Sequence, residues 1–92
     1  MPKAEQPRPT KELEQHRREA LKTLLEEQVL HALGRPGDLQ RVQVWPLWEN
    51  HYRVNILVGV DPVSMRVAHS FFLLGDGEGN ILASTPEITR QY

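Results

Sequence analysis

The stretch TKELEQHRREALKTLLEEQVLHAL, residues 10–33, decides how the rest of the chain must fold. An α-helix turns by about 100° per residue, and at that period the apolar side chains of this stretch gather on one broad face. That face comprises Ala20, Leu21, Leu24, Leu25, Val29, Ala32 and Leu33. Most charged side chains lie on the other side, and Leu30 also points away from the apolar face. The pattern predicts one long helix that buries a single face against another layer.

Both ends of this helix carry sequence signals. Thr10 can cap the N-terminus, because its hydroxyl can accept a hydrogen bond from an early helical N–H. Gly34 and Pro36 predict the end, since Gly favours the left-handed position after a helix and Pro cannot continue it. The first half has Leu13 as its only large apolar residue, so we expect its first turns to overhang or fray. Residues 1–9, with three prolines, are predicted to be a flexible tail.

Four segments with strand character follow the helix. They cover residues 39–48, 52–60, 65–74 and 80–84, and they are separated by clusters of turn-forming residues. The second segment alternates most cleanly, and its apolar side chains lie on the face that would meet the helix. A tight hairpin would bring Val44 near Ile56 and Val42 near Val58. The third segment is apolar on both faces, so the sequence leaves open which of two adjacent phenylalanines, residues 71 and 72, enters the core.

The order of these elements is α-β-β-β-β. It predicts an α+β fold in which one long N-terminal helix packs on one face of a four-stranded antiparallel meander. The domain covers residues 10–86, and residues 87–92 form a C-terminal tail. This order and size resemble PepSY-like and cystatin-like α+β modules, and the resemblance implies inhibiting or docking onto other proteins. The cystatin signature Q-x-V-x-G is not present, although Gln43, Val44 and Trp45 sit in a comparable hairpin strand.

Composition narrows the classes of function. The chain has 92 residues, a formal net charge of −1 and no cysteine, so disulfides and thiolate metal sites are excluded. Such a charge gives no general attraction to nucleic acid or anionic lipid. No apolar run approaches the roughly 20 residues of a membrane span, and the N-terminus lacks the apolar segment of a secretory signal. We expect a soluble, cytoplasmic single domain without a membrane partner.

Candidate catalytic and metal-binding residues are few. A zinc site needs three or four converging ligands, but two of the four histidines, His16 and His31, lie about four turns apart on the helix. His69 is the best acid–base candidate, yet no second catalytic partner accompanies it. The acidic residues of the loop 76–80 alternate as in calcium loops, but a glycine-rich hairpin explains them without the full calcium spacing. We predict no enzymatic activity, no cofactor and no metal.

The sheet face away from the helix is the predicted binding site. Its contact residues are Arg41, Trp45, Arg53, Asn55 and Leu57. Trp45, Leu57 and one phenylalanine form a larger apolar strip than a small monomer usually exposes. We therefore expect a non-enzymatic binding module that docks a protein partner or forms a homodimer through this face. One alternative is single-stranded nucleic acid on the same face, which the net charge disfavours; the other is a small-ligand pocket or enzyme site between helix and sheet.

Overall fold

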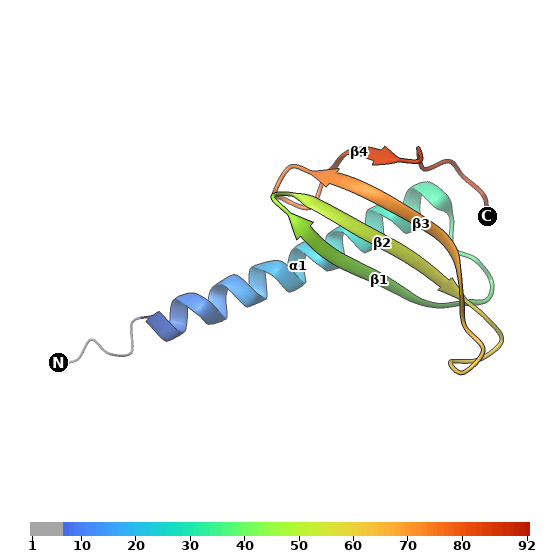
Figure 1. Ribbon diagram of the computed structural model, residues 1–92, viewed down its shortest axis with the longest axis horizontal. Helices are drawn as coiled ribbons and strands as arrows, with labels where there is room; N and C mark the ends of the chain where they lie inside the picture. Colours follow the sequence, from blue (N-terminus) through green and yellow to red (C-terminus); the bar gives the residue numbers. More distant parts are fainter. Residues whose placement is uncertain (1–6) are drawn as a thin grey trace.

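The structure is a computed structural model that describes residues 7–92, with side chains from residue 13 onward. One helix and four strands follow one another: α1 (Pro7–Leu33), β1 (Leu39–Trp48), β2 (His51–Val58), β3 (Arg66–Gly75) and β4 (Ile81–Thr85). The strands form an antiparallel sheet in the order β1-β2-β3-β4, and α1 packs on one of its faces (Figure 1). The predicted fold class is confirmed. β1 has the predicted bounds, and the other strands begin and end within two residues of theirs.

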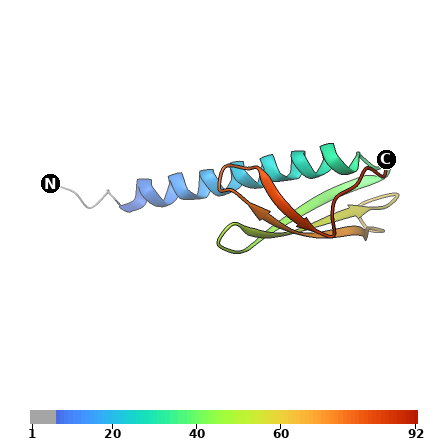
Figure 2. The same cartoon turned by 90° about the horizontal axis from the view of Figure 1, so that it is seen from above.

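The helix α1 is longer than predicted. It begins at Pro7, so Thr10 lies inside the helix and is not its N-cap. Proline is tolerated in a first helical turn because the N–H groups there have no intrahelical partner. The rest of the predicted N-terminal tail, residues 1–6, lies outside the described residues. The first half of α1 projects past the sheet, and Leu13 is 68% exposed, so the predicted overhang is present (Figure 2).

The hydrophobic core lies between the second half of α1 and the inner face of the sheet. Its buried side chains are Leu25, Val29, Leu30 and Leu33 from α1 and Val54, Ile56, Val58, Phe71 and Leu73 from β2 and β3. The helix is rotated about its axis relative to the prediction. Leu30, which was predicted to face away, is 8% exposed, whereas Leu24, predicted on the buried face, is 42% exposed. The side of α1 that carries Leu30 therefore faces the sheet, and the side that carries Leu24 is partly exposed to solvent.

The β1–β2 hairpin has a different register from the predicted one. Val42 pairs with Ile56 and not with Val58. The turn has only two residues, with Asn50 at φ 56°, and a register shift between Pro46 and Trp48 adds one more residue to β1. The prediction was wrong by two residues. Strand side chains alternate with a period of two, so Val42 and Val44 still lie on their predicted face. Trp48 was predicted on that face too, but it lies beyond the register shift and pairs with His51.

The register of β3 decides which phenylalanine is buried. A shift between β2 and β3 leaves Ala68 without a paired residue. Phe71 then pairs with Val54, which is in the core, and is 4% exposed. Phe72 pairs with Arg53 on the opposite face and is 47% exposed.

Residues 87–92 run back from β4 to the C-terminal end of α1, and we call them the C-terminal strap (Figure 1). The backbone N–H groups of Gln91 and Tyr92 donate to the carbonyl oxygen of Leu33 at 2.7 and 3.2 Å. The Tyr92 hydroxyl lies 2.8 Å from the Nε2 atom of His69 on β3. Gly34 packs so closely on the strap that an added Cβ would lie 2.5 Å from the Tyr92 carbonyl oxygen. The strap therefore pairs with one of the terminal carbonyl groups that a helix leaves free.

Candidate functional site

The sheet face opposite α1, which we call the outer face, is not covered by any segment of the described chain (Figure 2). The register of the strands places nine side chains in three rows across it: Trp45, Arg53 and Phe72; Gln43, Asn55 and Ser70; and Arg41, Leu57 and Val67. All five predicted contact residues are among them. The structure thus brings these five residues together on one surface, which is the first requirement of a common binding site.

The row of Trp45, Arg53 and Phe72 is the most exposed part of the outer face. Arg53 pairs with Trp45 on one side and with Phe72 on the other. Its guanidinium carbon lies 4.8 Å from the centre of the Phe72 ring, within the range of a cation–π interaction. Trp45 is 54% and Phe72 is 47% exposed. The row therefore presents one positive charge, which lies over the Phe72 ring, beside two half-exposed aromatic rings.

The middle row is a chain of polar contacts. The Ser70 hydroxyl donates to Oδ1 of Asn55 at 2.7 Å, and Nδ2 of Asn55 lies 3.4 Å from Oε1 of Gln43. The side chain of Asn55 is half-buried, and its oxygen and nitrogen both have partners within the sheet. Asn55 is on the predicted face, but it has less hydrogen-bonding capacity left for a ligand than its sequence position suggests.

The third row differs from the prediction in its apolar member. Leu57 lies on the outer face as expected, but it is only 8% exposed. Its neighbour Val67 on β3 is 53% exposed. Val67 is therefore an exposed apolar residue of this face that the sequence did not identify, and Phe72 is the phenylalanine that the sequence left undecided. Only the strand register could have found them, because β3 is apolar on both faces and its alternation alone does not say which side is outside.

The charge of the outer face differs from that of the whole chain. The four strands contain three arginines and no aspartate or glutamate, while the chain as a whole has a formal net charge of −1. The carboxylates lie on α1, in the turns and in the terminal segments. Arg41 and Arg53 on the outer face are thus not neutralised by an acidic residue within the sheet. The surface is aromatic and locally positive.

A hollow also lies between the helix and the sheet. This is where the alternative of a small-ligand pocket or an enzyme site would place the binding site. It has a volume of about 1020 Å³ and runs between α1 and β4, and we call it the α1–β4 groove. Its lining is Leu24, Glu27, Gln28, His31 and Ala32 of α1, residues 81–84 of β4, and Glu87 and Ile88 of the strap. His69, the one acid–base candidate of the sequence, is not part of this lining, because its ring faces Tyr92 and stacks with Phe71.

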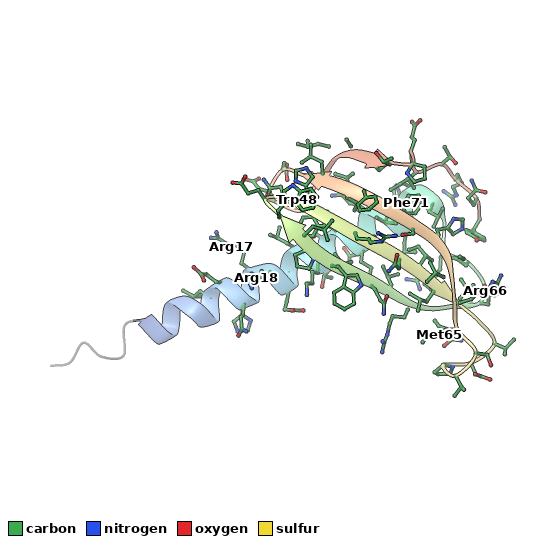
Figure 3. The ribbon with its side chains drawn as sticks, in the orientation of Figure 1. Arg17, Arg18, Trp48, Met65, Arg66 and Phe71 are labelled. Carbon is green, nitrogen blue, oxygen red and sulfur yellow. The ribbon has the colours of Figure 1, made fainter. Side chains whose placement is uncertain are left out.

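A smaller hollow of about 390 Å³ lies where the β1–β2 turn meets α1. Trp48 borders it, is 64% exposed and stacks on His51 with 4.9 Å between the ring centres. Trp48 lies at one end of the sheet, on the side of Arg18, and Arg66 lies at the other end (Figure 3). Trp48 pairs with His51 at the turn end of the β1–β2 hairpin, next to the row that contains Trp45 and Arg53.

The glycine-rich β3–β4 loop is fixed to α1. Asp76 accepts hydrogen bonds from the backbone N–H groups of Glu78 and Asn80 and from the side-chain amide of Asn80, at 2.8, 3.2 and 2.8 Å. The bonds from the Asn80 side chain and from the Glu78 N–H hold the pKa of the Asp76 carboxyl below its ordinary value. Gln28 of α1 donates to the carbonyl oxygen of Gly79 at 2.6 Å. The Asp76 side chain therefore braces a turn.

Metal-binding clusters and membrane-spanning helices are both lacking in the described part of the chain. In that part of the chain, no three His, Cys, Asp or Glu side chains lie close enough to hold a metal ion. Neither does the described chain contain a helix with the length and hydropathy to cross a membrane.

Comparisons with known proteins give no relative. No protein-family model matches the chain, and searches of the curated proteins and of the solved structures find no match either. The structure shows one helix on a four-stranded antiparallel sheet.

Proposed function

We propose that the protein is a non-enzymatic binding module that docks a protein partner on its outer face. The observation that carries this proposal is the exposed row of Trp45, Arg53 and Phe72 on an uncovered sheet. Tryptophan and arginine are the residues most enriched among those that dominate the energy of protein interfaces. Val67 extends the apolar surface along β3. The resemblance in element order to modules that dock onto other proteins is in line with this role.

The charges of the outer face favour an acidic partner over a second copy of the chain. A symmetric dimer through this face would place the same patch against itself. Arg41 and Arg53 would then approach the same two arginines, and no strand supplies a carboxylate to separate them. A partner with carboxylates around an apolar centre would instead pair with both arginines and cover the aromatic rings.

Single-stranded nucleic acid is the second candidate for the same face. Arginine beside exposed aromatic rings can also stack on bases. Among the described residues, however, only two arginines lie on the outer face, and the chain carries a net charge of −1. Nucleic-acid affinity comes largely from neutralised phosphates, so two cations would support weak binding at physiological salt.

The test uses charge reversal on and off the outer face. Baits of the wild-type chain, Trp45→Ala, Arg53→Glu and the control Arg17→Glu, which lies on the projecting half of α1, are compared by affinity capture and mass spectrometry. A protein enriched by the wild type is then purified, and its Kd is measured by calorimetry. We expect the Kd to rise by about tenfold or more for Trp45→Ala and Arg53→Glu and to stay unchanged for Arg17→Glu.

The rival interpretations give different results. A partner whose affinity ignores both substitutions would rule out the outer face. Dimers that form with rising concentration in sedimentation experiments, and that Trp45→Ala abolishes, would replace the acidic partner by a second copy. Binding of oligothymidine that weakens steeply with salt and is lost in Arg53→Glu would favour nucleic acid.

A further inference from the structure

The two edges of the sheet are protected to different degrees. β1 forms one edge and carries Arg41 and Pro46, a charge and a residue without a backbone N–H, which both discourage pairing with another strand. β4 forms the other edge with the sequence ILAST, which contains neither a charge nor a proline. Its only pairing partner among the described strands is β3. Apart from the Ile81 N–H, which bonds to Gln28, the side of the β4 backbone away from β3 is thus available for another extended segment.

The α1–β4 groove lies along this unprotected strand. Leu24 of α1 and Leu82 of β4 both line it, and they are 42% and 62% exposed. These are large apolar side chains on the two long walls of one groove. Ala32 and Ile81 add to the apolar lining. An extended segment placed beside β4 would therefore find backbone partners on one side and an apolar helix surface on the other, as in peptide recognition by strand addition.

Both ends of the groove are built from fixed contacts. At one end, Gln28 donates to the Gly79 carbonyl oxygen and accepts a hydrogen bond from the backbone N–H of Ile81 at 3.2 Å. At the other end, the strap is bonded to the Leu33 carbonyl oxygen, and the Ile88 N–H donates to the Ser84 hydroxyl at 3.2 Å. The walls are consequently held in place before a ligand arrives, which lowers the entropic cost of binding.

The charges of the lining indicate the composition of the occupant. Two exposed carboxylates line the groove, Glu27 on its α1 wall and Glu87 on the strap at one end. Of the lining residues that the structure describes, none is lysine or arginine. A segment with positive side chains at its flanks and apolar side chains between them would complement both the rim and the walls.

We propose that the α1–β4 groove binds an extended peptide segment with basic and apolar residues, which pairs with β4 as a fifth strand. This site lies on the helix side of the sheet and uses none of the residues of the outer face. The two surfaces can be occupied at the same time, and this inference does not depend on the function proposed above.

The experiment is a selection of displayed linear peptides of about ten residues on the full chain, followed by synthesis of the enriched peptides. Three variants are used: Leu82→Glu, the double variant Glu27→Lys with Glu87→Lys, and Trp45→Ala as a control on the outer face. All four substituted residues are exposed, and circular dichroism checks that each variant is folded. We expect enriched peptides to combine lysine or arginine with apolar residues, and their Kd to rise about tenfold or more in the first two variants only.

A second measurement separates strand pairing from contact by side chains alone. Alternate backbone nitrogens of a bound peptide are methylated in two complementary sets, since only one set would face β4. One set should raise the Kd about tenfold or more, and the other should have little effect. Nuclear magnetic resonance shifts should concentrate at residues 81–85. Equal effects of the two sets, peptides that bind Leu82→Glu as well as wild type, or an absence of enriched peptides would overturn the proposal.

Discussion

The guanidinium carbon of Arg53 lies 4.8 Å from the centre of the Phe72 ring, while the adjacent Phe71 lies on the opposite side of β3 in the core. Two neighbouring residues of the same type thus have different roles. The difference follows from the pairing of β3 with β2, because adjacent side chains of a strand point to opposite faces. This relationship gives a direct test of the strand register.

Replacing each phenylalanine by alanine should affect stability very differently. Phe71 is 4% exposed, so Phe71→Ala leaves a cavity and should lower the free energy of unfolding by about 3–5 kcal/mol. Phe72→Ala removes a cross-strand and cation–π contact and should cost about 1 kcal/mol. Urea unfolding followed by circular dichroism measures both. Equal losses would show that the register of β3 is wrong.

Gly79 should not tolerate a side chain. It has φ 92°, and an added Cβ would lie 2.6 Å from Cδ1 and 2.8 Å from Cβ of Leu24. We expect Gly79→Ala to lower the free energy of unfolding by about 1–3 kcal/mol, from backbone strain and displacement of α1. Gly37→Ala is the control, because no atom lies within 4 Å of its added Cβ. A thermal unfolding midpoint that falls by the same amount in both variants would contradict this packing.

The sequence predicted the faces of the strands better than it predicted the contacts of the helix. Alternation in β2 identified Val54 and Ile56 as inner residues, and a register error of two residues did not change that. The rotation of α1 was not predictable in the same way, because apolar residues occupy much of its circumference. Gln28 explains part of the observed rotation: its side chain bonds to a loop about 50 residues later in the chain, which no local pattern reports.

The candidate site shows the same division between local and long-range information. Arg41, Trp45 and Arg53 could be placed on one face from alternation alone. The exposure of Phe72 and the burial of Leu57 depend on a one-residue bulge in β3. The sequence does not reveal this bulge, because β3 is a run of apolar residues on both faces of the strand. The α1–β4 groove depends on the path of the C-terminal strap, which is set by hydrogen bonds to Leu33.

Removal of the Gln28 amide should loosen the β3–β4 loop. This side chain makes hydrogen bonds with the Gly79 carbonyl, the Asn80 side chain and the Ile81 N–H. We expect Gln28→Ala to reduce stability by about 1–3 kcal/mol, since these backbone groups are left without partners near the core. Amide hydrogen exchange should become faster in the loop and in β4. Thr23→Ala, which removes one exposed bond to the Glu19 carbonyl, should leave that exchange unchanged.

The carboxyl of Asp76 should make stability depend on pH in acid. Its pKa in the folded chain is held below the ordinary value of 3.8 by the Asn80 side chain and the Glu78 N–H. A carboxyl whose pKa is lower in the folded state binds protons more readily when unfolded. Its contribution is therefore fully present above the unfolded pKa and is lost as the pH falls from about 4 through the folded pKa. Carbon-detected titration of the Asp76 carboxyl should give a pKa below 3.8 in the native protein.

The matched variant is Asp76→Asn, which keeps the size of the side chain and removes its ionisation. The difference in free energy of unfolding between wild type and this variant should shrink as the pH is lowered from about 6 to about 3. Glu78→Gln is the control, because the Glu78 side chain is exposed and its backbone N–H, which remains in the variant, makes the bond to Asp76. A difference that stays constant over this range would mean that the Asp76 carboxylate does not brace the loop. The loop would then owe its shape to the glycines at φ 85° and 92° and to the contacts with α1.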